Sequence, residues 1–390
     1  MSKSLFIAST RQDIGKTSIS LGLIHLLKKN FGRIAFLKPL SQRYTLIEQQ
    51  KVSEDALLIK EVFALEDRIE DMSPLIIEKG LSEKYIQGEV GKGFRKRIRK
   101  AYENLVKQAD LLIIEGTGHS AVGSVFHLSN PEVAKLLEAD VLLVCEGGIG
   151  RSIDEINLNR SFFEQKGCRV LGVLVNKILQ EKYRRVSTCL KQYLQKEGIA
   201  LLGLLPYCPL LSNPPLWLIA QHTQAEIVSG EKCLERNIGR IIVGTMEPET
   251  ILELLRNISE QTLLITSADR IDLLLAVFTI YFRNIGKAHN LAGVLLSGKR
   301  ALPQSIKEIL LSVNLPILRA DEDIYTLASQ IYSLRTKITR EDKKKIDALQ
   351  KLAEEYIDIE KLNTLLKSEK KETKKRWRTK ILDFLKWRVG

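Results

Sequence analysis

A stretch near the start of the chain contains residue types that bind phosphate groups. Residues 4–18 read SLFIASTRQDIGKTS, in which an apolar run and a polar loop precede Gly15, Lys16 and Thr17. Apolar residues recur at helical spacing after the loop, which predicts a strand, a loop and a helix in that order. In this context backbone N–H groups and the helix N-terminus bind phosphates, the lysine adds a positive charge, and the threonine hydroxyl can bind Mg²⁺. We therefore expect a phosphate-binding loop (P-loop) here.

The loop departs in one place from the usual G-x-x-x-x-G-K-[ST] pattern. Its first glycine would fall at position 10, where this chain has Thr10. A chance Gly-Lys-Thr sequence between a strand and a helix is the alternative interpretation. The two interpretations differ in whether other parts of the chain bring matching side chains to the same place.

Near-continuous apolar runs recur along the first two hundred residues and alternate with helical segments. This pattern predicts an α/β fold, a P-loop NTPase-type parallel sheet with helices on both faces. Ligands on such sheets bind at the carboxyl ends of the strands. After the first strand, the predicted strands are residues 32–39, 110–116, 139–148, 169–177 and 200–206.

Polar residues follow several of these strands and would meet at one edge of the sheet. Glu115 is placed to hold Mg²⁺, directly or through water. Lys38 could contact a phosphate or an anionic substrate, and the Asn176 amide could pair with a purine edge. Asp55 precedes a predicted helix and is either an ordinary acid of its first turn or part of the site. Taken singly, Lys38 could also be a solvated lysine and Asn176 a turn residue.

Residues 4–206 resemble dethiobiotin synthetase and its relatives among amidoligase-type P-loop proteins. In that family the small first residue of the loop lies one position further from Gly-Lys-Thr, where this chain has Ser9. The resemblance implies that the matching residues bind ATP phosphates, contact substrate, complete the Mg²⁺ site and bind adenine. These matches are Ser9 to Thr17, Lys38-Pro39 with Ser41, Asp55-Ala56-Leu57, Glu115-Gly116, and Asn176.

A longer run is more similar to the N-terminal region of long phosphotransacetylases and to stand-alone versions of it. It reads EGTGHSAVGSV at 115–125, LSNPEVA at 128–134 and GGIGRSIDE at 147–155. His119 lies in this run and would sit beside the phosphates, as a catalytic or a structural hydrogen-bonding residue. The residues after 336 are too few to hold an acetyltransferase domain, so we expect no acetyl transfer.

A second predicted α/β unit resembles the DRTGG-type domain that follows this region in the same phosphotransacetylases. It has strands at 240–244, 261–266 and 290–298, and helices that begin at Pro248 and near Leu273. Asp269-Arg270 matches the domain's Asp-Arg pair and could form a structural ion pair, whereas the later Gly-Gly is Gly298-Lys299 here. The resemblance implies a regulatory or interface module.

The predicted site residues fall into three groups. Lys16, Lys38 and Glu115 would carry any phosphoryl chemistry, and Thr17, Asp55 and Glu115 would bind Mg²⁺. The residues expected to contact ATP are Ser9, Thr10, Arg11, Gln12, Asp13, Ile14, Gly15, Lys16, Thr17, Ser18, Asn176 and Pro206.

The chain divides into four predicted regions. These are the P-loop nucleotide-binding domain at 1–210, the DRTGG-type domain at 226–335, a helical segment at 336–366 and a basic tail at 367–390. In the helical segment Thr339 is predicted to cap a helix with acids in its first turn.

The formal net charge of +13 is concentrated at the end of the chain. Residues 367–390 hold ten Lys and Arg against three acids, which accounts for +7 and argues against a specific nucleic-acid partner. Trp377, Ile381, Phe384 and Leu385 recur at helical spacing, so the tail could lie on an anionic membrane surface, dock on a protein or stay solvated.

The remaining composition is that of a globular protein. Five scattered cysteines read as buried thiols in a reducing compartment, and neither a disulfide framework nor a zinc site is expected. No apolar stretch is long enough to span a membrane, so we expect a cytoplasmic protein that could be peripheral at the membrane. We also expect a homo-oligomer.

Three hypotheses about function follow. The first is a Mg-ATP-binding protein whose second domain senses an unknown small metabolite. The second is an ATP-dependent ligase that activates a carboxylate, as in dethiobiotin synthesis or cobyrinate amidation. The third is a non-enzymatic adaptor that acts through its tail.

Overall fold

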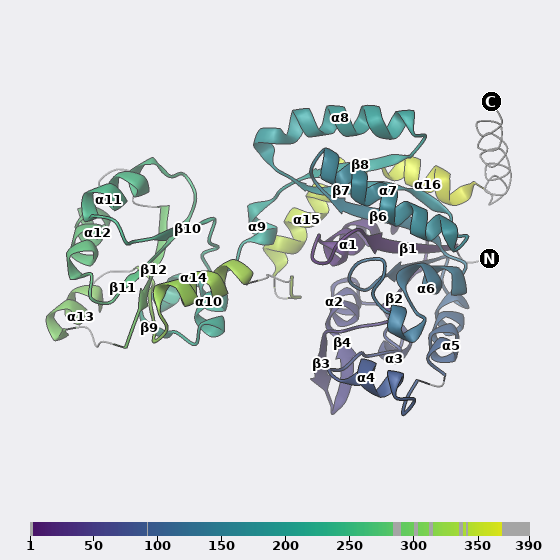
Figure 1. Cartoon of the computed structure of the whole chain (residues 1–390), viewed down its shortest axis with the longest axis horizontal. Helices are drawn as coiled ribbons and strands as arrows, with labels where there is room; N and C mark the ends of the chain where they lie inside the picture. The colour runs from purple at the N-terminus through teal and green to yellow at the C-terminus, as the bar shows by residue number, and fades with distance from the viewer. Residues whose placement is uncertain are drawn as a thin grey trace. The chain divides into compact units, whose positions relative to one another are not determined.

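The computed structural model of the chain describes residues 3–91, 93–283, 290–299, 303–311, 315–334, 338–340 and 342–368. These residues form two compact units (Figure 1). The first unit contains the described residues up to Tyr207 and those from Ile338 onward, and the second begins at Cys208 and lies between them in sequence. The predicted amphipathic stripe of the basic tail falls in 369–390, outside the described residues.

The first unit is built on a six-stranded parallel sheet in the order β2-β5-β1-β6-β7-β8. The strands are β1 (Lys3–Ser9), β2 (Ile34–Leu37), β5 (Leu111–Glu115), β6 (Asp140–Glu146), β7 (Val170–Ile178) and β8 (Leu201–Pro206). All six were predicted from apolar runs, and the predicted P-loop NTPase-type parallel sheet is confirmed. Strands β1, β2 and β5 are buried almost throughout, which explains why their sequences do not alternate.

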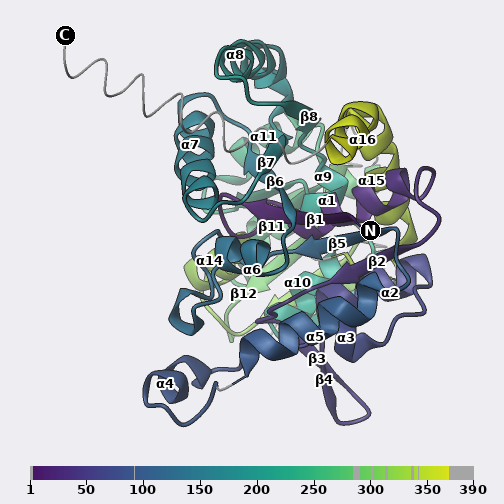
Figure 2. The ribbon, with the colours of Figure 1, turned by 90° about the vertical axis from the view of Figure 1, so that its right-hand side faces the viewer.

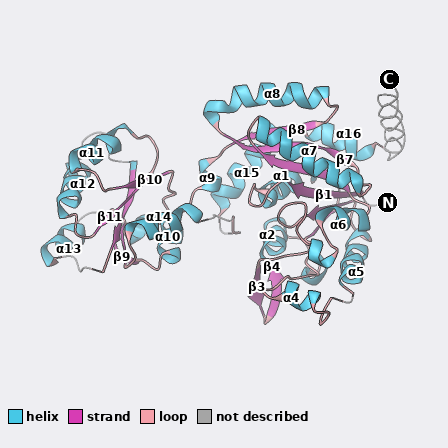
Figure 3. Cartoon of the chain, in the orientation of Figure 1, coloured by secondary structure: helices cyan, strands magenta, loops and turns pink. Residues whose placement is uncertain are grey.

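Helices connect these strands and cover both faces of the sheet (Figures 2 and 3). They are α1 (Lys16–Leu27), α2 (Glu54–Phe63), α3 (Ile69–Met72), α4 (Leu81–Ile86), α5 (Phe94–Val106), α6 (Asn130–Leu136), α7 (Gly150–Gln165) and α8 (Tyr183–Lys196). Short 3₁₀ turns lie at Ser124–Phe126 and Gln180–Lys182. A two-stranded hairpin, β3 (Tyr44–Ile47) with β4 (Gln50–Ser53), forms a separate sheet that was not predicted.

The strand order determines which face each helix covers. The chain moves from β1 to β2 in one direction across the sheet and from β5 through β8 in the other. Right-handed crossovers therefore place α1 on one face and α6, α7 and α8 on the opposite face.

Two helices from the end of the described chain, α15 (Lys343–Tyr356) and α16 (Ile359–Lys367), complete the α1 face. Helix α15 packs on α1, and α15 and α16 both contact β8. Figure 2 shows α16 and α7 on opposite sides of β7. The backbone continues this contact, because Asp358 N–H donates to the Leu202 carbonyl at 2.8 Å. The predicted helical segment is thus part of the first unit.

The start of α15 differs from the prediction. The helix begins at Lys343 after Asp342 and has no acid in its first turn. The Thr339 hydroxyl donates to the Asp342 carboxylate at 3.1 Å, so Thr339 does not cap the helix itself. The cap prediction was wrong because a local Thr-Asp turn uses both side chains before the helix starts.

The second unit has a five-stranded sheet in the order β10-β11-β12-β13-β9, in which β9 is antiparallel to β13. Its strands are β9 (Glu226–Ser229), β10 (Arg240–Val243), β11 (Thr262–Ser267), β12 (Leu291–Ser297) and β13 (Ile317–Ala320). Its helices are α9 (Pro209–Ser212), α10 (Leu216–His222), α11 (Pro248–Asn257), α12 (Ile271–Arg283), α13 (Gln304–Leu311) and α14 (Ile324–Ser333), with a 3₁₀ turn at Glu231–Cys233.

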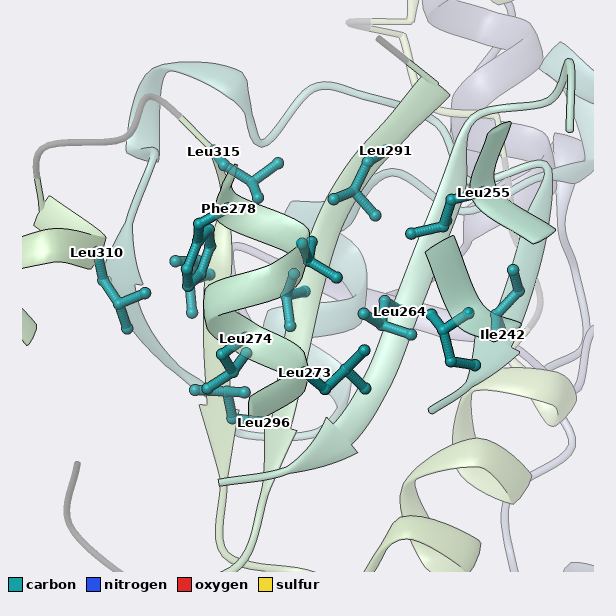
Figure 4. Packing of buried hydrophobic residues seen from close by; sticks show 14 of the residues in the cluster. Ile242, Leu255, Leu264, Leu273, Leu274, Phe278, Leu291, Leu296, Leu310 and Leu315 are labelled. Atoms are coloured by element: carbon teal, nitrogen blue, oxygen red, sulfur yellow. The ribbon is translucent and has the colours of Figure 1, made fainter. Parts of the chain in front are cut away.

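Both faces of this second sheet carry an apolar core. On one face Leu264, Leu273, Phe278 and Leu296 pack together between the strands and α11, α12 and α13 (Figure 4). On the other face Leu216 and Leu327 belong to a cluster formed with α10 and α14. The smaller α/β domain predicted after the P-loop region is therefore confirmed.

The cysteines and the membrane expectation can be compared directly with the structure. All five cysteines are free, but Cys189, Cys208 and Cys233 are only partly buried, so the expectation of five buried thiols was wrong. Among the helices that the structure describes, none is both long enough and apolar enough to cross a membrane.

The close packing of α1 on α15 gives a stability prediction. A Cβ atom at Gly22 would lie 2.8 Å from the Cβ of Ala353, closer than two carbon atoms can approach. Although alanine usually stabilises a helix relative to glycine by up to about 1 kcal/mol, we expect Gly22→Ala to lower the free energy of unfolding of the first unit by about 1–3 kcal/mol. Urea denaturation followed by circular dichroism measures this change.

The compensating variant Gly22→Ala with Ala353→Gly is the control. It removes the clashing methyl group and should recover most of the lost stability. A Gly22→Ala variant as stable as the wild type would contradict the packing of these two helices.

Candidate functional site

The loop between β1 and α1 follows a tightly constrained path. Gly15 has a φ of 91°, in the left-handed region, and a Cβ atom there would lie 2.7 Å from Nδ2 of Asn176. Only glycine combines this backbone conformation with such a close neighbour. The loop therefore passes close to Asn176 and leads directly into the N-terminus of α1.

The amine of Lys16 is buried at this edge. It donates to the Ser9 hydroxyl at 2.7 Å and to the Gly118 carbonyl at 2.6 Å. Burial, together with the positive charge of Lys38, lowers the pKa of Lys16 to about 8, against an opposing effect of Glu115. The residue expected to bind phosphate is thus a cation held by two neutral oxygen atoms, which an anionic phosphate oxygen would bind more strongly.

A second buried amine, that of Lys38, lies between two carboxylates. Its Nζ is 2.7 Å from Oε1 of Glu115 and 3.0 Å from Oδ2 of Asp55. Burial by itself would lower the pKa of Lys38, but the two carboxylates more than offset it and raise the pKa above its ordinary value. Lys38 is therefore a fixed positive charge within the predicted site, and the alternative of a solvated surface lysine was wrong.

The residues predicted to bind Mg²⁺ lie together in the same cluster. The Thr17 hydroxyl is 3.0 Å from Oε1 of Glu115 and 3.3 Å from Oδ1 of Asp55. The Ser20 hydroxyl donates to the other Glu115 oxygen at 2.7 Å and fixes the carboxylate. Asp55 is an acid in the first turn of α2, as its alternative interpretation held, and its carboxylate also reaches this cluster.

This donor set fits a hard divalent cation. Hydroxyl and carboxylate oxygens are the ligands that Mg²⁺ takes, usually with several further positions filled by water or phosphate. Within the described residues there is no cluster of three or more His, Cys, Asp and Glu side chains that could hold a metal by itself. A Mg²⁺ ion here would accordingly be bound by Thr17 and the two carboxylates together with phosphate oxygens or water.

The end of β7 supports the loop from the other side. Asn176 Nδ2 donates to the Ile14 carbonyl at 2.9 Å, and Lys177 Nζ donates to the Asp13 carbonyl at 2.9 Å. Pro206, at the end of the neighbouring strand β8, is in register with Ile178. Asn176 and Pro206 therefore lie at the predicted edge, and Asn176 uses an amide hydrogen to hold the loop.

Glu155 organises the start of the loop and was not predicted to have a role. This residue of α7 accepts a hydrogen bond from the Thr10 hydroxyl at 2.7 Å and pairs with the guanidinium groups of Arg11 and Arg151. These partners hold the pKa of Glu155 below its ordinary value although burial raises it. The sequence signal that could have indicated Glu155 is its position early in α7, because this helix follows β6, which ends at the same edge of the sheet as the P-loop.

Four other candidates are His119, Ser41, Gln12 and Ser18. His119 is exposed, and its Nδ1 accepts a hydrogen bond from the Ala121 N–H at 3.3 Å. The buried Ser41 hydroxyl donates to the Arg43 carbonyl at 2.7 Å. Gln12 is exposed on the loop and Ser18 is partly buried in the first turn of α1.

In the second unit the ion pair of Arg270 is with Asp272, at 2.9 Å. The same guanidinium donates to the carbonyls of Thr245 and Met246, which follow β10. Arg270 therefore links the turn after β11 to the turn after β10 at the carboxyl edge of this sheet.

The sheet order, the loop shaped by Gly15, the buried lysines and the carboxylate cluster together define a P-loop NTPase-type domain, which a second α/β unit follows. Comparison with family models agrees. Residues 3–215 match an AAA domain family and residues 218–334 match the DRTGG domain. The chain belongs to this AAA domain family, whose members resemble dethiobiotin synthetase, and it carries a DRTGG domain.

The curated relatives are of two kinds. A phosphate acetyltransferase of Synechocystis is 26% identical over 374 residues, which cover 94% of this chain and 52% of that protein. An ATP-dependent dethiobiotin synthetase of Clostridium novyi is 26% identical over 188 residues, 45% of this chain and 76% of the relative. The chain thus spans about half the length of the phosphate acetyltransferases that it matches and is homologous to their N-terminal region.

Two solved structures that match parts of this chain have low similarity to it. The MinC:MinD cell division protein complex of Aquifex aeolicus matches 54% of this chain and 84% of its own, with 15% identity and a TM-score of 0.34. The CBS and DRTGG domains of Clostridium perfringens pyrophosphatase, complexed with the activator diadenosine tetraphosphate, match 31% of this chain and 47% of their own, with 20% identity and a TM-score of 0.25.

The buried position of Lys38 gives a second prediction. Lys38→Met should leave Asp55 and Glu115 without their cation and lower the free energy of unfolding of the first unit by about 3–5 kcal/mol. Because the folded pKa lies above the ordinary value of 10.5, the contribution of Lys38 is fully present below that pH. Lys38 itself therefore stays protonated between about pH 6 and 9, whereas loss of its charge raises the pKa of Lys16, so the deficit should grow as the pH rises through about 8. Added Mg²⁺ should restore part of the deficit by neutralising the carboxylates.

Lys29→Met is the matched control, because Lys29 pairs with Glu354 on the surface. It should change the unfolding midpoint little. Equal effects of the two substitutions in urea titrations would contradict a buried, charge-neutralising role for Lys38.

Proposed function

We propose that the first unit binds Mg-ATP at the carboxyl edge of its sheet. The observation that carries the proposal is that Lys16 and Thr17 of α1, Asp55 of α2 and Glu115 of β5, from three separate segments, form one cluster. A chance Gly-Lys-Thr sequence would not bring the buried carboxylate of Glu115 and the partly buried carboxylate of Asp55 to the threonine hydroxyl. The confined loop at Gly15 supports the same conclusion, because its backbone can approach a phosphate closely.

Each residue has a defined part in this binding. Backbone N–H groups of the loop and the N-terminus of α1 would face the phosphates, and Lys16 would exchange the Gly118 carbonyl for a phosphate oxygen. Thr17, Asp55 and Glu115 would hold Mg²⁺, which neutralises phosphate charge when it is bound. Lys38 would keep the carboxylates oriented and supply a positive charge to an incoming anion.

We further propose that the second unit senses a small metabolite and regulates the first, in the cytoplasm. The chain enters this unit directly after β8 and leaves it directly before α15, which packs on the P-loop helix α1. The second unit is therefore joined through the chain to α15, the helix that covers α1. The match to the DRTGG domain and to the same region of phosphate acetyltransferases supports this assignment.

An ATP-dependent ligase is the second candidate function, and Lys38 is the observation that favours it. A second buried cation beside the carboxylate cluster could position a carboxylate substrate next to the terminal phosphate of ATP. Phosphate release from ATP that a dicarboxylic or diamino-carboxylic acid stimulates at least tenfold would favour the ligase. Unstimulated hydrolysis, with ATP affinity that changes with metabolites, would favour the sensor.

Isothermal titration calorimetry tests nucleotide binding. We expect wild-type protein to bind Mg-ATP and Lys16→Ala to bind it at least about tenfold more weakly, the value of a lost charged hydrogen bond. Asp55→Asn should weaken binding in the presence of Mg²⁺ and have a smaller effect in EDTA. Lys29→Ala, a surface lysine of the same unit, is the control. Failure of both wild type and Lys16→Ala to bind would overturn the proposal.

The lowered pKa of Lys16 gives a pH prediction. At pH values above about 8 part of the Lys16 amine is neutral in the free protein, and a bound phosphate favours the charged form. Binding of Mg-ATP at about pH 9 should therefore take up protons, whereas binding at about pH 6.5 should not. Calorimetry in two buffers of different ionisation enthalpy measures this uptake. Lys16→Arg should abolish it, because guanidinium stays protonated; undiminished uptake by Lys16→Arg would assign the proton to another group.

A further inference from the structure

A cavity of about 550 Å³ lies in the first unit, outside the carboxylate cluster. Its walls come from the hairpin strand β4, from residues 68–76 around α3, and from α5. This volume is in the range of pockets that hold small metabolites. The side chains that matter for what it binds are Ser73, Arg97 and Lys100.

Ser73 presents a hydroxyl group that the protein itself does not satisfy. The residue is 8% exposed, and its Oγ has no hydrogen-bond partner among the described residues. A buried hydroxyl without a partner is unfavourable, and such groups in native proteins usually face water or a ligand. Ser73 lines the cavity, so the cavity is where its partner would lie.

The charges around the cavity leave one positive charge in excess, because four cations and three carboxylates line it. Glu78 is paired with Lys51 at 2.5 Å and Glu70 with Arg68 at 3.4 Å. A third carboxylate, that of Asp71, accepts a hydrogen bond from the Asn104 amide at 3.0 Å.

Two cations on α5 remain. Arg97 donates to the Pro74 carbonyl at 2.6 Å, which fixes its guanidinium beside the wall that contains Ser73. Lys100, one helical turn further on, forms no ion pair within the part of the chain that the structure describes. A guanidinium, an amine and a hydroxyl group in one cavity are the donors that recognise anionic oxygen atoms.

We propose that this cavity binds a small metabolite that carries carboxylate or phosphate groups. Lys100 and Arg97 supply the charge, and Ser73 donates the hydrogen bond that the protein leaves unused. The site is separate from the P-loop, so it can be tested without nucleotide.

The walls of the cavity continue into the two segments that carry Lys38 and Asp55. The Lys38 N–H donates to the Met72 carbonyl at 2.7 Å, and the Ser41 N–H donates to the Leu75 carbonyl at 2.9 Å. Strand β4 leads directly through Ser53, the N-cap, into the first turn of α2 with Asp55. A ligand in the cavity should therefore also change the affinity for Mg-ATP, a coupling that rests on the proposed function.

Calorimetry on the full chain tests the site, with pyrophosphate and citrate as the two probes and with Lys16→Ala as the background. This background weakens phosphate binding at the P-loop, the competing site. We expect saturable binding of at least one probe, about tenfold weaker in Lys100→Ala and in Ser73→Ala, as for the loss of one hydrogen bond to a charged group. Pyrophosphate or citrate preference distinguishes a phosphate from a carboxylate ligand.

Lys96→Ala is the matched control, because it removes the same charge from an exposed position of α5 outside the cavity. Its affinity should equal that of the background. Absence of binding by both probes at millimolar concentration would overturn the proposal, as would equal losses in Lys96→Ala and Lys100→Ala. Ser73→Ala should be as stable as the background in thermal unfolding, which separates a lost ligand contact from a folding defect.

The coupling is measured by titrating Mg-ATP with and without the probe, at a constant concentration of free Mg²⁺, in wild-type protein and in Lys100→Ala. A shift in ATP affinity that Lys100→Ala loses supports the coupling, and a shift that is absent or equal in the two proteins overturns it while the site stands. If wild-type protein does not bind Mg-ATP, the proposed function fails. The titrations in the Lys16→Ala background still decide whether the cavity binds an anionic ligand.

Discussion

The structure depends on two lysine amines that are buried side by side at one edge of a parallel sheet. Lys38 is stabilised there by the carboxylates of Asp55 and Glu115, whereas the hydrogen-bond partners of Lys16 among the described residues are the uncharged oxygen atoms of Ser9 and Gly118. Burying charge in this way costs free energy that apolar side chains of similar size would not require. The arrangement is therefore best explained by a ligand that needs both positive charges, and a nucleotide with Mg²⁺ satisfies the chemistry of every group in the cluster.

A second constraint arises from the helix that carries Lys16. Ile19, Leu21, Leu23 and Ile24 of α1 are all buried, so this helix is apolar around its circumference and needs cover on its outer side. Helix α15 supplies that cover, although its sequence follows the DRTGG unit. Helix α1 is thus covered by a segment that follows the second unit in the sequence. The proposed nucleotide site and the proposed sensing unit are therefore linked through the packing of α15 on α1, which lies within the first unit.

Much of this architecture could be predicted from the sequence. The strands of the large sheet are buried apolar runs, and the polar residues at their carboxyl ends, such as Glu115 and Asn176, follow from the parallel topology. The β3–β4 hairpin was missed because its turn residues, Glu48 and Gln49, have positive φ angles but are not the glycine or asparagine that signals such a turn.

Other features leave no pattern along the chain. The Gly118 carbonyl that binds Lys16 is a backbone atom without a sequence signature, and Glu155 acts through contacts that only the packing of α7 beside the loop creates. Strand β13 is four residues long, too short for a clear period, and the cavity at Ser73 depends on three separate elements.

A structure determined with Mg²⁺ and a non-hydrolysable ATP analogue tests the central claim most directly. The account predicts phosphates against the N–H groups of the loop, the Lys16 amine on a phosphate oxygen in place of the Gly118 carbonyl, and the metal bound by Thr17 with Asp55 and Glu115. A nucleotide bound elsewhere on the chain, or a Lys16 amine that stays on Gly118 beside a bound nucleotide, would contradict it.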